Sequence, residues 1–89
     1  MSSEESIDKQ PENETPKFTP EEIEELCSEA NEYKTKGNDF FGRSEYEQAI
    51  SMYQRALDVC PLEKTKERAT YWNNLGACYM KLVNMHAKT

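Results

Sequence analysis

The stretch that decides the fold is Glu32–Gly42, EYKTKGNDFFG, a helical pattern with a glycine inside it. Aromatic residues stand four positions before Gly37 and three positions after it, so they share one helical face. The same spacing surrounds Gly76 in residues 70–82, TYWNNLGACYMKL. A glycine inside a helix costs about 1 kcal/mol relative to alanine. We therefore predict that each glycine admits a closely packed neighbouring helix, with the bulky residues above and below filling the gap.

Three segments around this stretch carry apolar residues at helical spacing. The first begins at Thr19, which with Glu22 forms a predicted capping box, and Pro20 suits the first helical position. Its apolar stripe comprises Ile23, Leu26, Ala30, Tyr33, Gly37 and Phe40. The second segment begins at another predicted capping box, Ser44 with Glu47. Its stripe comprises Tyr46, Ala49, Ile50, Tyr53, Ala56, Leu57 and Cys60.

The third segment follows Pro61, which ends the second helix because proline cannot continue the helical ladder. Its stripe comprises Ala69, Trp72, Leu75, Gly76, Tyr79, Leu82 and Val83. The aromatic residues of all three stripes are interpreted as core rather than as a ligand-stacking box, because their spacing is helical. We predict an all-α fold of three amphipathic helices at about residues 19–42, 45–60 and 66–84, with short joins that make neighbours antiparallel.

Charge is distributed unevenly along the 89 residues. The net charge is -6, but residues 1–29 carry ten acidic and two basic side chains, and the rest is slightly basic. Residues 1–18 are polar and interrupted by two prolines, so we predict a disordered acidic tail there. A helical module at 19–84 and a frayed end at 85–89 would follow. The slightly basic module suits an acidic partner, and no dense Lys/Arg patch indicates nucleic-acid binding.

Nothing in the sequence indicates an enzyme, and we expect no cofactor and no metal. Cys27, Cys60 and Cys78 are widely spaced without a C-x-x-C pattern, so we expect free, buried or half-buried thiols in a reducing compartment. His86 has no nucleophile arranged with it, and no phosphate-binding loop or metalloprotease motif is present. No apolar run reaches the length of a signal peptide or membrane span, so the expected location is the cytoplasm or the nucleus.

The residues that follow Gly37 occur in the register of a known helical repeat, with small, aromatic and terminal positions at Ala49, Tyr53, Ala56 and Pro61. Residues 72–79, WNNLGACY, begin a second copy of the pattern. On these residues the chain resembles the tetratricopeptide repeat (TPR) family, and within it the co-chaperone adaptors. The resemblance covers about residues 30–82. It implies an antiparallel helix-turn-helix unit followed by the first helix of a second repeat.

The chain also departs from the family pattern. Lys36 stands where a leucine is usual, and the two glycines are 39 residues apart, whereas the family period is 34. Twelve positions after the second glycine, where the family buries a small residue, the chain has Lys88 and then ends at Thr89. About one and a half repeats are present, whereas about three are usually needed for independent stability. We therefore expect a truncated product, an unusual isoform or an excised piece.

The resemblance implies a binding site as well. In the family's co-chaperone members, Lys and Asn side chains in a groove form a carboxylate clamp for acidic C-terminal peptides of heat-shock chaperones. The resemblance assigns this clamp to Lys34, Asn38 and Asn74, and assigns an apolar peptide contact to Phe41. The chemistry is consistent, because a carboxylate only accepts hydrogen bonds and needs a cation and amide donors. The family's clamp also uses basic residues from a third repeat, so reduced affinity is expected here.

Three alternatives remain open. Lys34, Asn38 and Asn74 are each also consistent with solvated surface residues. The chain could instead be a general scaffold or a self-associating fragment, because the unfinished second repeat leaves apolar surface uncovered around Trp72 and Tyr79. The acidic tail could also fold over the slightly basic groove and compete with an acidic peptide.

Overall fold

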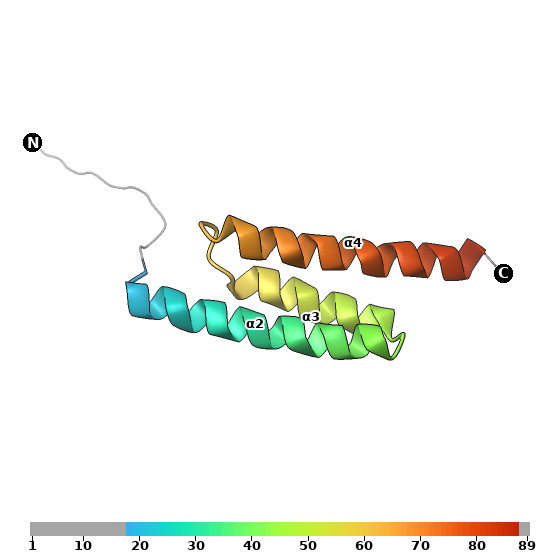
Figure 1. The fold of residues 1–89 in the computed structure, drawn as a ribbon, viewed down its shortest axis with the longest axis horizontal. Helices are drawn as coiled ribbons and strands as arrows, with labels where there is room; N and C mark the ends of the chain where they lie inside the picture. The colour runs from blue at the N-terminus through green and yellow to red at the C-terminus, as the bar shows by residue number, and fades with distance from the viewer. Residues whose placement is uncertain (1–17, 88–89) are drawn as a thin grey trace, which may run out of the picture.

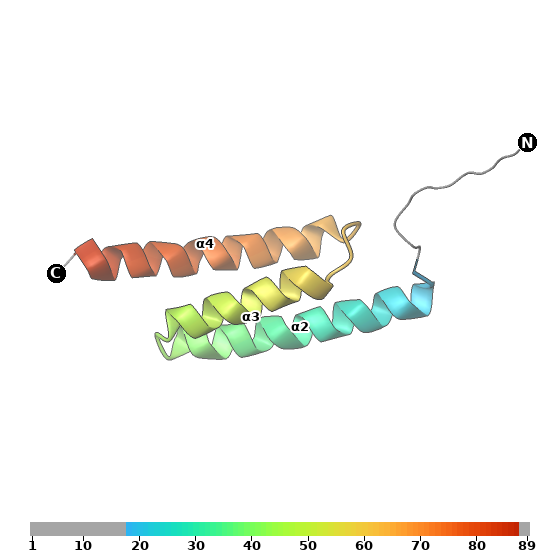
Figure 2. The ribbon, with the colours of Figure 1, turned by 180° about the vertical axis from the view of Figure 1, so that it is seen from behind.

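The computed structural model describes residues 18–87, which form three α-helices and no strand. Helix α2 spans Pro20–Gly42, α3 spans Tyr46–Val59 and α4 spans Thr65–Ala87. Figure 1 and, from behind, Figure 2 show α3 lying antiparallel beside α2, while α4 runs in the same direction as α2. The all-α fold predicted from the sequence is confirmed.

Residues 1–17 and 88–89 lie outside the described part, so the disordered acidic tail stays a prediction. The predicted frayed end is described only in part, and α4 continues to Ala87, past residue 84 where we predicted its end. No helix within residues 18–87 is both long enough and apolar enough to cross a membrane.

The start of α2 has the predicted capping box. The Thr19 hydroxyl accepts a hydrogen bond from the backbone N–H of Glu22 at 3.1 Å, and the Glu22 carboxylate accepts one from the Thr19 N–H at 2.9 Å. Pro20 occupies the first turn, where its missing N–H has no helical partner to lose. Local chemistry therefore fixes where this helix begins.

A glycine and a tyrosine set the distance between α2 and α3. Gly37 and Tyr53 are both buried, and a Cβ built on Gly37 would lie 2.6 Å from Cε1 of the Tyr53 ring. Real Cβ atoms do not approach a ring this closely, so only glycine fits at this position. Ala49 and Ala56, one turn to either side of the tyrosine, are both 0% exposed. The close approach predicted at Gly37 is confirmed.

The predicted capping box at the start of α3 is wrong. The N-cap residue is Glu45, and no side chain bonds to the helix there. Ser44 has a φ of 63°, in the left-handed region, and its Oγ accepts a hydrogen bond from the Tyr46 hydroxyl at 3.4 Å. The turn is closed through the backbone, because the Glu45 N–H donates to the Phe40 carbonyl at 2.9 Å. Reversing the chain in so few residues needs a left-handed residue, which removes Ser44 from the capping geometry.

Arg68, on α4, completes the end of α3. Its Nη1 donates to the Leu57 carbonyl at 2.9 Å and to the Cys60 carbonyl at 3.0 Å. In a continuing helix the Leu57 carbonyl would accept from the N–H of the residue four positions on, but that residue is Pro61 and has none. The guanidinium supplies the missing donor and ties α4 to α3.

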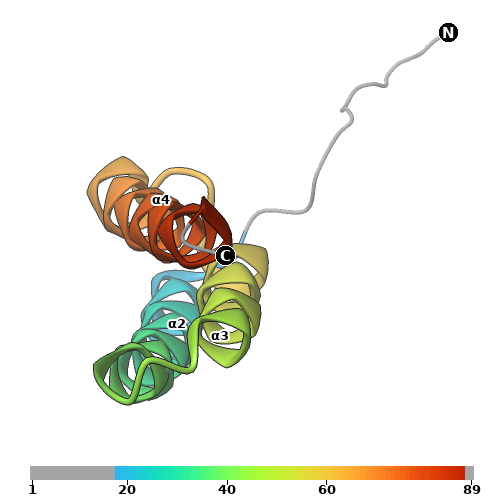
Figure 3. The ribbon, with the colours of Figure 1, turned by 90° about the vertical axis from the view of Figure 1, so that its right-hand side faces the viewer.

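The core lies where α3 packs against both α2 and α4. Seen end-on in Figure 3, the three helices stand at the corners of a triangle. The buried apolar residues are Ala30, Ala49, Tyr53, Ala56, Leu57, Cys60, Tyr71, Leu75 and Cys78. All of the stripe predicted for α3 and most of that predicted for α2 belong to this core or pack against it; Ile23 and Leu26, near the start of α2, do not.

Helix α4 turns a different face to the core than predicted. The interpretation of the stripe as core is correct for Leu75, which is buried, but wrong for Trp72 and Tyr79, which are 59% and 48% exposed. Their exposure agrees with the alternative that apolar surface there is uncovered. Tyr71 and Cys78, which were outside the predicted stripe, are buried beside Leu75. Two apolar stripes run along this helix, and the sequence pattern alone does not say which one meets α3.

Gly76 therefore differs from its counterpart on α2. It is exposed, and a Cβ built on it would meet no atom within 4 Å. The close helix approach predicted at Gly76 is not made by the described part of the chain. The glycine stands on the open side of α4, because the helix packs through its other stripe.

Candidate functional site

Two of the predicted clamp residues share one face of α2. Lys34 and Asn38 are one helical turn apart, with Lys34 half-buried and Asn38 exposed. Within residues 18–87 the Lys34 ammonium forms no ion pair. The neighbouring Lys36 lies over the Tyr33 ring, with its ammonium 5.8 Å from the ring centroid. Lys34 is therefore the cation on this face that is available to a ligand.

Tyr53 holds the Asn38 amide from the core side. Its hydroxyl donates to Asn38 Oδ1 at 2.5 Å. Burial, and to a smaller extent the nearby Cys78, raises the pKa of Tyr53, so the hydroxyl keeps its proton and remains the donor. Because the acceptor end of the amide is occupied, its N–H donors are the part left for a ligand. A cation one turn away from two amide donors is an arrangement that suits a carboxylate.

The other two predicted site residues are placed differently. Asn74 is half-buried on α4, and no hydrogen bond in the described part of the chain joins it to Lys34 or Asn38. Phe41 is half-buried at the end of α2, where its ring meets that of Tyr46 edge to face, with centroids 5.2 Å apart. The Phe41 ring therefore helps to close the α2–α3 turn, and only part of it is left for another contact.

A pocket of about 560 Å³ opens on the same face of α2, nearer its start. It is lined by Phe18, Pro20, Ile23, Glu24, Cys27, Glu63, Lys64 and Glu67. Lys34 lies seven residues after Cys27, which is two turns further along this face. Three glutamates and one lysine line this pocket, so its charge is negative.

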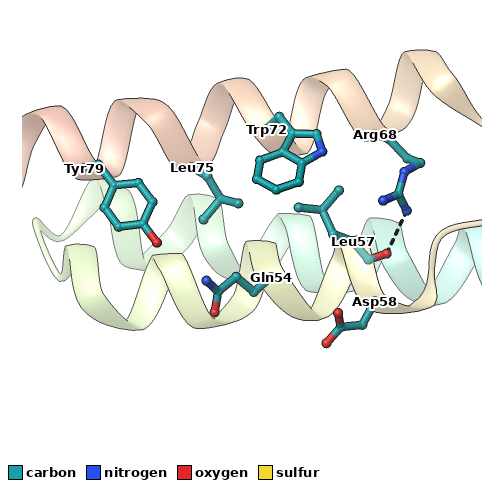
Figure 4. Close-up of a pocket in the computed structure, with 7 residues that line it drawn as sticks. All are labelled: Gln54, Leu57, Asp58, Arg68, Trp72, Leu75 and Tyr79. Atoms are coloured by element: carbon teal, nitrogen blue, oxygen red, sulfur yellow. Dashed lines mark hydrogen bonds between the residues drawn. The ribbon is translucent and has the colours of Figure 1, made fainter. Parts of the chain in front are cut away.

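A second pocket, of about 350 Å³, lies between α3 and α4. It is lined by Gln54, Leu57, Asp58, Arg68, Trp72, Leu75 and Tyr79. Figure 4 shows the Trp72 indole above Leu57 and the Tyr79 ring pointing from α4 toward α3. A neighbouring pocket of about 520 Å³ continues past Tyr79 to Leu82 and Val83. The sequence suggested uncovered apolar surface here, but only the packing of α4 shows its position.

The cysteines have the burial expected of free thiols. Cys27 is half-buried, and Cys60 and Cys78 are buried. Burial raises the pKa of both buried thiols, and for Cys60 the neighbouring Cys27 adds to the effect. A raised pKa keeps a thiol protonated and therefore unreactive. Among residues 18–87, no group of three or more His, Cys, Asp or Glu side chains could hold a metal ion.

Sequence comparison relates the chain to three larger proteins. It is 41% identical over 49 residues to the mitochondrial import receptor subunit TOM70 of Rattus norvegicus, covering 55% of this chain and 8% of the receptor. It is 33% identical over 61 residues to DnaJ homolog subfamily C member 7 of Mus musculus, covering 68% of this chain and 11% of the homolog. A TOM70 of Saccharomyces cerevisiae is 36% identical over 77 residues, covering 80% of this chain and 11% of the receptor.

These relatives contain TPR repeats, and the similarity supports the repeat family inferred from the sequence. The chain spans about a tenth of the length of these relatives. No family model matches the chain, and no solved structure matches it. A closest resemblance to one member, tetratricopeptide repeat protein 1, stays a prediction, because these relatives support the family and not that protein.

Proposed function

We propose that the chain is a non-catalytic adaptor module that binds the free C-terminal carboxylate of an acidic peptide, of the kind carried by heat-shock chaperones. Lys34 and Asn38 are the primary contacts, Asn74 is a further amide donor and Phe41 is an apolar contact. The observation that carries the proposal is the hydrogen bond from Tyr53 to Asn38, which leaves the amide donors beside Lys34, a lysine that forms no ion pair within residues 18–87. Similarity to an import receptor and to a DnaJ homolog supports a protein ligand. The free thiols suit a reducing compartment such as the cytoplasm.

The sharpest test is Asn38→Asp. The aspartate keeps an oxygen that accepts from the Tyr53 hydroxyl, but it replaces the amide donors with a second acceptor. The folded structure should therefore survive, while a carboxylate ligand meets a like charge. We expect binding of a short glutamate-rich peptide that ends in aspartate to weaken at least about tenfold by calorimetry, with the helical circular dichroism unchanged.

The charge of the site is tested by Lys34→Glu, with Lys66→Glu as the matched control. Both lysines are on helices and the net charge changes equally, but Lys66 lies on α4 outside the α2 face. Only Lys34→Glu should abolish binding, and higher salt should weaken the wild-type complex. A peptide with an amidated C-terminus should not bind. Equal binding of the free and amidated peptides would refute the carboxylate site.

A second candidate function is self-association through the open side of α4. It is favoured by the exposure of large apolar side chains on this helix, with Trp72 at 59%, Met80 at 68% and Val83 at 65%. Apolar patches of this kind commonly mark protein contacts. The two candidates use different faces of the molecule, so Asn38→Asp should leave self-association unchanged.

A further inference from the structure

The two partners of the hydrogen bond between Tyr53 and Asn38 differ in their freedom to move. Tyr53 is 2% exposed, and its ring is held against Gly37. Its hydroxyl makes one hydrogen bond within residues 18–87, and that bond goes to Asn38 Oδ1. Asn38 is exposed on α2, and its side-chain amide makes no other hydrogen bond with the described residues. The tyrosine is therefore fixed by packing, and the amide is fixed only through the tyrosine.

An asparagine amide offers opposite chemistry at its two ends. The oxygen accepts hydrogen bonds, and the NH2 group donates them. With the oxygen toward Tyr53, the two N–H donors of Asn38 face outward. With the NH2 group toward Tyr53, the oxygen would face outward and accept. The orientation of this amide therefore decides whether the site pairs with an acceptor or with a donor on a ligand.

The buried hydroxyl favours the first orientation. A buried donor that lacks an acceptor is unfavourable. If the Asn38 amide turned round, its NH2 group would face the Tyr53 hydroxyl, and the hydroxyl proton would have no acceptor among residues 18–87. The hydroxyl therefore keeps the amide oxygen inward and the N–H donors outward.

We propose that Tyr53 determines the specificity of the carboxylate site. By holding the Asn38 amide in one orientation, it makes the site bind a C-terminal carboxylate and reject a C-terminal carboxamide. This inference rests on the proposed function above and adds the residue from which the selectivity arises. Tyr53 is a positioning residue, because it acts on the ligand through Asn38 and does not contact it.

The selectivity follows from a count of donors and acceptors. Lys34 and Asn38 lie one turn apart, and both offer N–H donors in this arrangement. A carboxylate has two acceptor oxygens, one for each of these residues. A carboxamide has one oxygen, so its own NH2 group would face the second donor. If Asn38 turned its oxygen outward, the carboxamide could pair with both residues.

The variant that tests this role is Tyr53→Phe, which keeps the ring against Gly37 and removes only the hydroxyl. Nothing then holds the Asn38 amide in one orientation. Affinity for a glutamate-rich peptide that ends in aspartate should fall about twofold to fivefold, because only part of the molecules present the donors. The amidated peptide should bind more tightly than to wild type. The ratio of the two dissociation constants, measured by NMR titration, should therefore fall, and an unchanged ratio would overturn the inference.

Tyr71→Phe is the matched control. Tyr71 is also 2% exposed, and its hydroxyl forms no hydrogen bond with residues 18–87. This variant removes a buried hydroxyl that does not contact Asn38, so the affinities for both peptides should stay at their wild-type values. Circular dichroism establishes that both variants are folded at the temperature of the titration. An equal loss of selectivity in the two variants would show a general loosening of the core and would reject the role of Tyr53.

The orientation of the amide can also be measured without a ligand. In the wild-type protein the Asn38 Nδ2 protons point away from the Tyr53 ring, so we expect no nuclear Overhauser effect between them. In Tyr53→Phe the amide turns in part of the molecules, and an effect to the ring at position 53 should appear. An effect of this kind in the wild-type protein would overturn the inference.

The two proposals fail in different ways. Equal binding of the free and amidated peptides to the wild-type protein would refute the carboxylate site itself, and the inference about its selectivity with it. Unequal binding to wild type that Tyr53→Phe leaves unchanged would refute only the role of Tyr53.

Discussion

At the scale of single residues, Tyr53 serves both the core and the candidate site. Its ring lies against Gly37, and its hydroxyl holds the amide of Asn38. The ring atoms nearest Gly37 include Cζ, which carries the hydroxyl, so the position of the ring fixes the position from which the hydroxyl donates. Through the Tyr53 side chain, Gly37 thus influences the position of the amide of Asn38, the next residue in the chain.

This arrangement predicts that Gly37→Ala destabilises the protein although alanine is the better helix former. The new Cβ would lie 2.6 Å from a buried ring that is held at its hydroxyl, so the helices must separate. We expect the free energy of unfolding in urea to fall by about 1–3 kcal/mol. Gly42→Ala, in open space, should keep or slightly raise it. Equal stability of the two variants would show that the Gly37 contact is not tight.

The sequence correctly predicts contacts that depend only on residues close together in the chain. The Thr19–Glu22 capping box needs only one turn of helix, and it forms as predicted. Ser44 has the same sequence signature, but the tight turn between helices imposes a φ of 63° and overrides it. The capping sequence therefore predicts the cap correctly only where no tight turn precedes the helix.

At the scale of helices, Arg68 connects two elements that few other polar contacts join. We predict that Arg68→Ala lowers the free energy of unfolding by about 1–3 kcal/mol, because hydrogen bonds from a charged donor to two carbonyls are lost. Arg55→Ala, at an exposed position of α3, should change it by less than about 0.5 kcal/mol. Arg68→Lys should recover part of the loss. If Arg68→Ala and Arg55→Ala change the free energy of unfolding equally, other groups donate to the Leu57 and Cys60 carbonyls, and the prediction is wrong.

The choice of face on α4 could not be read from the sequence. Trp72 and Tyr79 match the repeat pattern better than Tyr71 and Cys78, yet the latter pair is buried. In the described part of the chain α4 has only α3 and α2 beside it, so one of its two apolar stripes stays open. Periodicity identifies stripes, but only the neighbouring helices decide which stripe is covered.

At the scale of the whole molecule, the buried titratable groups predict alkaline instability. Burial raises the pKa of Tyr53, Tyr71, Cys60 and Cys78 in the folded state. In the unfolded chain, thiols titrate near pH 8.5 and tyrosines near pH 10, each value being about the ordinary one. Above these values the folded state holds more protons than the unfolded state, so stability falls as pH rises.

We therefore expect the urea midpoint to be constant from about pH 7 to pH 8 and to fall at higher pH. Cys78→Ala should be less stable at pH 7, since a buried side chain is truncated, but it should lose less between pH 7 and pH 10. A reducing agent keeps the thiols from oxidising during the measurement. An unchanged midpoint up to pH 11 would contradict the assignment of protonated buried groups.

The candidate site was predicted in part. Lys34 and Asn38 could be placed together from their spacing, because i and i+4 share a helical face whatever the rest of the fold does. The role of Tyr53 as the partner of Asn38 could not, because the two residues come from different helices. Asn74 depends on how α4 is oriented, and its contribution to the site stays a prediction.

If the proposed ligand binds Asn38, the hydrogen bond between Tyr53 and Asn38 links ligand binding to folding. A ligand that grips Asn38 only in the folded chain raises the unfolding free energy by about 2.7 kcal/mol at a hundredfold excess over its dissociation constant. Thermal shift is then a direct assay for ligands of this face. The converse also holds. A substitution that weakens the packing of α2 against α3 lowers the fraction of folded protein, and the apparent affinity for the ligand falls in proportion to that fraction. The affinities of variants must therefore be compared under conditions in which the same fraction of each variant is folded.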